Sequence, residues 1–111
     1  MTFERFAVVI VPFPFTDIPV TRRRPALVLS ERGWNTASAH RVCAMITSAR
    51  QSAWPLDVPV TDLAAAGLTV PCVVRMKLFT IPAGLVIRQA GMLDDNDAAA
   101  VRAACAALLG S

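Results

Sequence analysis

The chain consists of short apolar runs separated by polar or proline-containing breaks. Residues 6–13 are continuously apolar and rich in Val and Ile, which predicts a strand buried on both faces. Residues 41–47 alternate between two faces, the pattern of a strand within a sheet. Further short strands are predicted where apolar residues lie between Pro and Gly positions, at residues 25–30, 56–60, 72–76, 78–81 and 85–87.

The C-terminal segment has a helical period instead. Apolar residues within 98–109 recur at helical spacing, Asp94 can cap the start of the helix, and Gly110 can end it. Residues 61–67 predict a shorter helical turn that closes at its glycine. The pattern therefore predicts an α+β fold, with a curled, mostly antiparallel sheet and one long C-terminal helix, in a single domain over residues 1–111.

The composition limits the class of protein. Hydrophobic residues make up 55% of the chain and charged residues 17%, a balance typical of a folded protein rather than a disordered one. The three cysteines are far apart with apolar neighbours, so we expect buried thiols rather than disulfides or a zinc motif. The first apolar run is too short to cross a bilayer. We therefore expect a soluble, cytoplasmic protein with no membrane segment.

Positive charge is concentrated in the first half of the chain. Residues 1–50 contain seven Arg against three acidic residues, whereas residues 51–111 contain four basic and five acidic residues. Arg22, Arg23 and Arg24 are adjacent in a connection of about ten residues between the first two strands. We expect Arg22 and Arg23 in the freer part of this loop, and Arg24, directly before Pro25, in an extended conformation at the start of the second strand. Such a loop can bind a phosphate, or it can simply keep a hydrophobic chain soluble, and composition alone favours neither.

The side-chain chemistry excludes several mechanisms. His40 is the only histidine, so a pair of histidines for acid and base catalysis is not available. The sequence has no cluster of His, Cys or carboxylates at metal-ligand spacing and no phosphate-binding glycine motif, so we expect no metal and no cofactor. Thr47 and Ser48 follow the strand core, where a hydroxyl can contact a phosphate or cap a turn, and capping is the commoner role.

Five segments, in this order, resemble the MazF/PemK family of bacterial type II toxins: VPFPFTD, RRPALVLS, a strand that ends in ITS, VVRMKLFTI, and LDDNDAAAVRAACAALLG. The resemblance covers nearly the whole chain. It implies the CcdB/PemK-type fold, a small SH3-like β-barrel with a C-terminal helix, and a homodimer. It also implies a metal-independent endoribonuclease that cleaves single-stranded RNA, mRNA included. In that reaction the RNA 2′-hydroxyl attacks the adjacent phosphate and leaves a 2′,3′-cyclic phosphate and a 5′-hydroxyl. A cognate antitoxin protein would silence the activity.

The same resemblance assigns site residues. It implies that Arg24 of the RP motif and Thr47 at the end of the ITS strand form the catalytic pair. Arg75 of the VVR segment is implied as a further active-site residue. We expect contacts to RNA from the polar residues Asp17, Arg22, Arg23, Ser48 and Lys77.

The sequence departs from the family pattern at two places. Lys77 stands where the PemK branch has an aspartate, so the acid and base roles of that branch cannot be transferred as a set. Phe6 and Ala7 replace the usual Gly-Asp before the first strand, which puts the local geometry in question rather than the chemistry.

Elementary chemistry divides the roles further. Arginine is a poor proton acceptor at neutral pH, so we assign Arg24 electrostatic stabilisation and Thr47 the positioning of the phosphate. Asp17 is the nearest carboxylate in sequence that could accept the 2′-proton. Trp34 and Trp54 have polar neighbours and are the best candidates for exposed rings that stack on bases. Two alternatives stay open: an inactive copy that still binds antitoxin, and a toxin that acts by binding protein, as the CcdB toxins act on gyrase.

Overall fold

The structure is a computed structural model, which describes residues 3–13, 22–50 and 52–110. Its strands are β1 (Ala7–Phe13), β2 (Arg22–Val28), β3 (His40–Ser48), β4 (Val58–Pro59), β5 (Cys72–Pro82) and β6 (Arg88–Met92). Its helices are α1 (Arg32–Ser38), α2 (Leu63–Ala66), the 3-10 turn η1 (Ala83–Leu85) and α3 (Asp95–Leu109). The predicted α+β class is confirmed.

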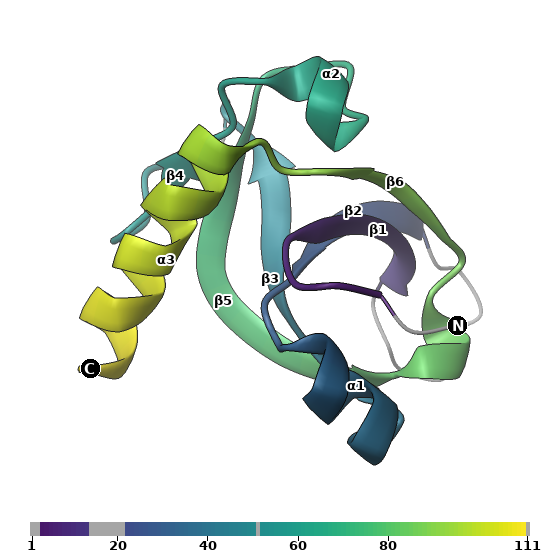
Figure 1. Cartoon of the computed structure of the whole chain (residues 1–111). Helices are drawn as coiled ribbons and strands as arrows, with labels where there is room; N and C mark the ends of the chain where they lie inside the picture. The colour runs from purple at the N-terminus through teal and green to yellow at the C-terminus, as the bar shows by residue number, and fades with distance from the viewer. Residues whose placement is uncertain (1–2, 14–21, 51, 111) are drawn as a thin grey trace.

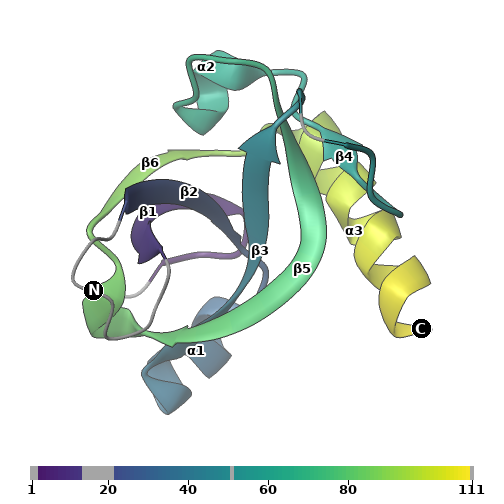
Figure 2. The same cartoon turned by 180° about the vertical axis from the view of Figure 1, so that it is seen from behind.

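The strands form one sheet in the order β4-β5-β3-β2-β1-β6, and each described pair is antiparallel. Figures 1 and 2 show this sheet curled into a partial barrel, with α3 packed beside β4 and β5 and with α1 and α2 at opposite ends. The predicted combination of a small curled sheet and a long C-terminal helix is therefore confirmed.

A β-bulge bends the long strand β5. Ala44 of β3 pairs with Leu78 and the next residue, Met45, pairs with Arg75, so the register shift leaves Met76 and Lys77 between these pairs. An irregularity of this kind increases the local twist and bend of a strand. The prediction of two separate strands at 72–76 and 78–81 is thus wrong in one respect, because both belong to one bent strand.

Apolar side chains cover both faces of the sheet. On one face Val8, Leu27, Ala44, Ile46 and Val74 form a cluster with Val101 and Cys105 of α3. The other face includes Ala7, Val9, Val11, Ala26, Val28, Cys43 and Ile81. The three cysteines are buried and free, as predicted, and burial raises the pKa of the Cys43 thiol to about 12. Such thiols act as small hydrophobic groups rather than as nucleophiles.

The two predicted helical segments are confirmed, with their caps. The Asp94 side chain accepts a hydrogen bond from the Asp97 backbone N–H at the start of α3, and Gly110 ends this helix in the left-handed conformation. Gly67 ends α2 at a φ of 71°. A Cβ there would lie 2.2 Å from the backbone oxygen of Ala90, so this close approach requires glycine.

Two further segments differ from the prediction. The short helix α1 was not predicted, because it has no side-chain cap at its start and contains Gly33, Trp34 and Asn35, which are weak helix formers. The strand predicted at 85–87 is also wrong, since Leu85 belongs to the turn η1 and the strand β6 begins at Arg88, although the Ile87 N–H already donates to the Ile10 oxygen of β1 at 2.8 Å. Within the described part of the chain, no helix combines the length and apolar character needed to cross a membrane.

Candidate active site

The three adjacent arginines lie in a strand rather than in a loop. Arg22, Arg23 and Arg24 are the first residues of β2, opposite residues 11–13 of β1. The loop prediction is wrong for Arg22 and Arg23, because backbone pairing with β1 extends the strand through polar residues whose side chains are exposed. The extended position predicted for Arg24 is confirmed. Since side chains alternate along a strand, Arg22 and Arg24 share a face with Ala26, and Arg23 points to the opposite face.

Arg24 and Thr47 line the same cleft. They lie on the neighbouring strands β2 and β3, which are held in register by the pairing of Ala26 with Met45. The cleft has a volume of about 160 Å³. Its remaining lining is mostly apolar: Val11, Phe13, Pro25, Ala26, Met45, Ile46 and Phe79. One guanidinium and one hydroxyl therefore line a cleft whose other lining residues are mostly apolar.

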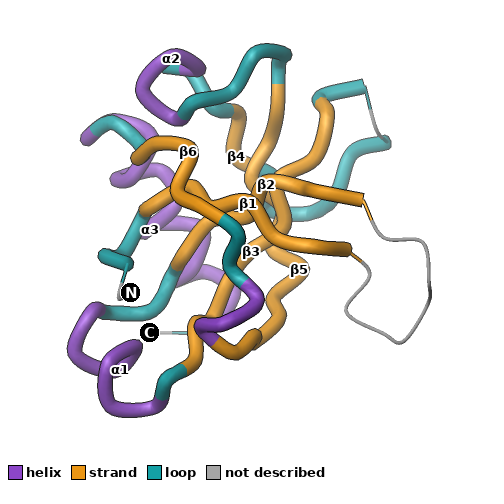
Figure 3. The backbone as a smooth tube through the Cα atoms, turned by 90° about the vertical axis from the view of Figure 1, so that its right-hand side faces the viewer, coloured by secondary structure: helices purple, strands orange, loops and turns teal. Residues whose placement is uncertain are grey.

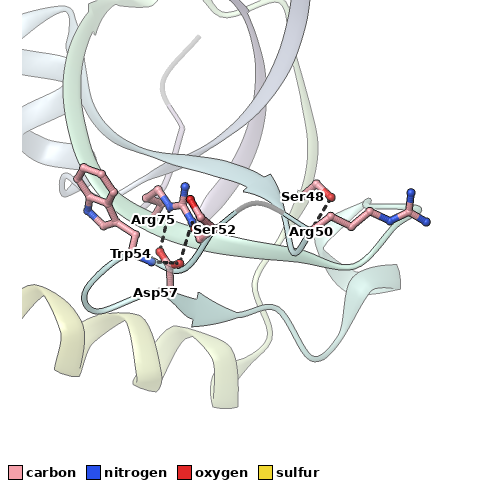
Figure 4. A network of polar contacts seen from close by, with 6 residues as sticks. All are labelled: Ser48, Arg50, Ser52, Trp54, Asp57 and Arg75. Atoms are coloured by element: carbon pink, nitrogen blue, oxygen red, sulfur yellow. Dashed lines mark hydrogen bonds and ion pairs between the residues drawn. The ribbon is translucent and has the colours of Figure 1, made fainter.

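Arg75 lies on the same face of the sheet, but it is bound to a carboxylate. It is opposite Met45 in the β3–β5 register, and directly opposed side chains point to the same face. Its Nε donates to Asp57 Oδ1 at 3.1 Å and its Nη2 to Asp57 Oδ2 at 2.9 Å (Figure 4). This hydrogen bond lowers the pKa of the Asp57 carboxyl and raises the pKa of Arg75. Both groups are therefore charged over the physiological range.

The other predicted site residues are distributed around the cleft. Ser48 follows Thr47 and points to the opposite face of β3, where its Oγ accepts a hydrogen bond from the Arg50 backbone N–H at 3.3 Å. Lys77 is exposed at the bulge of β5, with its Nζ 5.1 Å from the centre of a Trp54 ring. Asp17 lies outside the described residues. The structure thus brings Arg24 and Thr47 together and separates Ser48 from them.

The two tryptophans are both exposed, as predicted, but at different places. Trp54 precedes β4 and touches Arg75 and Lys77, which lie on β5. Trp34 is on α1, which packs at the start of β3 through a hydrogen bond from Arg41 to the Asn35 backbone oxygen. Because Thr47 is near the other end of β3, about 20 Å along the strand, Trp34 is removed from the candidate RNA contacts.

Comparison with models of protein families gives one match over nearly the whole chain. The model described as a PemK-like, MazF-like toxin of type II toxin–antitoxin systems matches residues 4–109. The chain belongs to this toxin family. The family resemblance predicted from the five sequence segments is therefore confirmed.

Solved structures of MazF toxins share the fold. MazF (Form-I) from Deinococcus radiodurans has 22% sequence identity and a TM-score of 0.77, over 100% of this chain and 99% of that chain. The Mycobacterium tuberculosis toxin MazF-mt6 has 25% identity and a TM-score of 0.75, over 94% of this chain and 96% of its own. An endoribonuclease in complex with its cognate antitoxin from a mycobacterial species has 16% identity and a TM-score of 0.75, over 98% and 94% of the two chains. No curated protein sequence matches this chain.

In this MazF-like toxin, Phe6 replaces the family's glycine at the turn that enters β1. Phe6 adopts a φ of 71°, the left-handed conformation that glycine enters without cost. Its backbone N–H donates to the Val28 oxygen at 2.7 Å, and its ring lies under the guanidinium groups of Arg5 and Arg102, each 4.8 Å from the ring centre. The turn that enters β1 therefore forms with Phe6 at a position whose backbone conformation favours glycine.

Sequence reasoning missed Asp57, which forms an ion pair with the predicted site residue Arg75. Its partner Arg75 is far from it in sequence, so no local pattern links the two. One signal was present in the sequence. A basic residue within a strand needs a counter-charge. Because Lys77 stands where the PemK branch has an aspartate, the counter-charge of Arg75 had to come from another part of the chain. No group of three His, Cys, Asp or Glu suited to a metal ion occurs in residues 3–13, 22–50 and 52–110.

Proposed function

We propose that this toxin is a sequence-specific, metal-independent endoribonuclease that cleaves single-stranded RNA, including mRNA. Membership of the MazF-like family supports the activity. The observation that carries the proposal is the cleft shared by Arg24 and Thr47, because it joins a phosphate-binding cation to a hydroxyl on adjacent strands. These are the two residues to which the family resemblance assigns catalysis.

The reaction needs an internal nucleophile and stabilisation of charge. The 2′-oxygen of one ribose forms a bond to the adjacent phosphorus, the bond from phosphorus to the 5′-oxygen breaks, and a 2′,3′-cyclic phosphate results. The 2′-proton passes to a base and the departing 5′-oxygen takes up a proton. Arg24 stabilises the charge that develops on the phosphate oxygens, and Thr47 orients the phosphate by one hydrogen bond.

The remaining predicted residues have supporting roles in this proposal. Arg22 attracts the RNA backbone toward the cleft, with Arg23 and Lys77 adding to the positive field. Arg75 contributes less charge than Arg24, since Asp57 neutralises it. Asp17 is proposed as the base for the 2′-proton. Ser48 binds RNA only outside the cleft, on the opposite face of β3.

A protein partner and a second copy of the chain are also part of the proposal. Two of the similar structures are complexes, a MazE-MazF pair from Deinococcus radiodurans and a mycobacterial endoribonuclease with its cognate antitoxin. By analogy, we expect a cognate antitoxin that silences this toxin in the cytoplasm. We also expect a homodimer, on the strength of the family resemblance.

The test is cleavage of a long, varied single-stranded RNA in EDTA by the wild type and by Arg24→Ala. Losing one donor to the transition state costs roughly 10²- to 10³-fold in rate, so the variant should be almost inactive. Fragments with 2′,3′-cyclic phosphate ends, formed by the wild type only, would support the mechanism and reveal the target motif. A folded wild type that binds antitoxin but cuts no RNA would favour the inactive or protein-binding alternative.

A further inference from the structure

The segment from Ser52 to Asp57 is held by a single ion pair (Figure 4). Besides its bonds to Asp57, Arg75 Nη2 donates to the Ser52 backbone oxygen at 2.6 Å. Asp57 Oδ2 in turn accepts from the Trp54 backbone N–H at 3.1 Å, and the Asp57 N–H donates to the Trp54 oxygen at 3.2 Å. The side chains of Arg75 and Asp57 are only 11% and 17% exposed, so the two charge-assisted bonds between them are partly shielded from water, whereas the bonds to Ser52 and Trp54 are exposed. They fix the backbone of Trp54.

The ring on this fixed backbone is open to solvent. Trp54 is 43% exposed, whereas large aromatic side chains are usually well buried. Two cations lie against it, the Arg75 guanidinium at 5.7 Å and the Lys77 ammonium at 5.1 Å from the ring centre. An exposed indole on a rigid support presents a flat surface at a low entropic cost on binding. Of these two cations Lys77 is the one that attracts phosphate, because Asp57 neutralises Arg75.

The ring also lies close to the cleft. Arg75 is opposite Met45, and Met45 lines the cleft together with Arg24 and Thr47. Arg75 on β5 and Arg24 on β2 are separated by the one strand β3, a distance of about 10 Å between strand axes. Figure 3 shows that the ends of β1 and β2 and the loop after β3 lie toward the same side of the molecule. An RNA strand across these strands would pass both places.

We propose that Trp54 is a stacking platform for a nucleobase beside the scissile phosphate, and that it contributes to the choice of cleavage site. The inference rests on the proposed function. A base stacks on the indole, its phosphate approaches Lys77, and the ion pair of Arg75 and Asp57 keeps the platform in place. Lys77 therefore has a binding role in this toxin at the position where the acid of the PemK branch is missing.

The first test compares cleavage by Trp54→Ala, Trp54→Phe and Trp34→Ala. Trp34 is a matched control because it is the only other tryptophan, is similarly exposed at 46%, and lies at the far end of β3. Loss of one stacked base corresponds to a fall of about 5- to 150-fold in kcat/KM, expected for Trp54→Ala alone. Trp54→Phe keeps an aromatic face and should stay within a few-fold of the wild type. The mapped cut sites of Trp54→Ala should lose their preference at one nucleotide near the cut.

The second test does not require cleavage. In Trp34→Phe the only tryptophan is Trp54, so its fluorescence reports contact directly. Short single-stranded oligoribonucleotides of random sequence, with 2′-O-methyl riboses to prevent cleavage, should quench it saturably. If RNA quenched the Trp54 fluorescence but the protein cleaved no RNA in the first test, the proposed endoribonuclease activity would be contradicted, whereas base stacking on Trp54 would be supported.

Other outcomes would overturn the platform. If Trp54→Ala and Trp34→Ala cleaved RNA at identical rates and cut sites, the proposed endoribonuclease activity would stand, but Trp54 would have no stacking role. Oligonucleotide binding, seen by a gel shift, with unchanged Trp54 fluorescence would have the same meaning. Quenching by an acidic antitoxin peptide but not by RNA would assign the surface to a protein partner instead.

Discussion

At the scale of single residues, Arg24 combines an exposed guanidinium with a constrained backbone. Its position in β2 is fixed by pairing with Val11 and by Pro25, which restricts the preceding residue to extended conformations. Only the side chain must be ordered when a phosphate binds. An arginine in a flexible loop would lose more entropy in the same step. The strand position of Arg24, which Pro25 predicts and the structure shows, is thus better suited to binding a phosphate than a position in a loop would be.

Thr47 allows a nearly isosteric test of the cleft. Thr47→Val replaces the hydroxyl by a methyl group and keeps a β-branched side chain that suits a strand. The loss of one hydrogen bond to a charged phosphate should lower kcat by about 10- to 100-fold, with the unfolding midpoint almost unchanged. Steady-state cleavage of a defined RNA and a urea titration measure the two quantities.

Thr80→Val is the matched control for that substitution. Thr80 is exposed on β5, in the same sheet, next to Phe79 in sequence and so on the opposite face from the cleft. Its substitution should leave cleavage unchanged. If Thr47→Val were as active as Thr80→Val, the hydroxyl would have no part in the reaction.

Phe6 shows how a residue that breaks a local preference is accommodated. A left-handed conformation costs a non-glycine residue roughly 1–2 kcal/mol. Burial of the ring and the two guanidinium groups over its faces offset this cost, since an aromatic side chain contributes more than that when buried. The strained position is therefore compatible with a stable turn into β1.

At the scale of elements, local signals and long-range pairing determined what could be predicted. The helix α3 and the strand β3 were predicted correctly because their capping residues and alternating pattern are local features of the sequence. The start of β2 and the continuity of β5 were missed because both depend on partners distant in sequence. The same holds for the site: Arg24 and Thr47 could be named from a family pattern, whereas the Arg75–Asp57 pair depends on the folded loop.

A buried carboxylate of α3 forms hydrogen bonds to the segment before α2. Asp97 is 3% exposed and accepts hydrogen bonds from Thr61 N at 3.0 Å, Thr61 Oγ1 at 2.7 Å and Asp62 N at 3.1 Å. Burial, the largest single influence, raises the pKa of Asp97, but these hydrogen bonds together outweigh it and the pKa is lowered. The charged form is therefore favoured by folding.

A pH-dependent loss of stability should follow from Asp97→Asn. A carboxyl whose pKa is lowered on folding stabilises the protein above its unfolded pKa, near 3.9 for an aspartate, and this contribution is lost as the pH falls through the folded value. Asp97→Asn should lower the free energy of unfolding by about 1–3 kcal/mol at neutral pH and by less near pH 3. Urea unfolding at both pH values measures the difference.

Asp95→Asn separates this effect from the charge of the helix start. Asp95 is exposed in the first turn of α3, so its substitution removes the same favourable interaction with the helix dipole but no buried hydrogen bond. It should cost less than about 1 kcal/mol at neutral pH. An equal loss for both variants, or a loss for Asp97→Asn that does not depend on pH, would contradict the assignment.

At the scale of the whole molecule, the distribution of charge matters more than its sum. The formal net charge is only +3, but seven arginines lie in residues 1–50. Two of them, Arg22 and Arg24, point to the cleft face from one strand, whereas Arg32 forms an ion pair with Glu4 away from it. A strand of RNA would therefore be attracted to one face of the toxin rather than to its whole surface.

Binding of single-stranded RNA should accordingly weaken with salt, in proportion to the phosphates contacted on that face. For single strands, the slope of log affinity against log salt is about −0.7 for each phosphate neutralised. Arg22→Ala should make this slope shallower by about 0.7, measured with the uncleavable RNA over a series of salt concentrations. Arg88→Ala is the control, because Arg88 on β6 is opposite Ile10 and points away from the cleft face. If both variants shifted the slope equally, RNA would be held by the overall charge, and the cleft face would not be its binding surface.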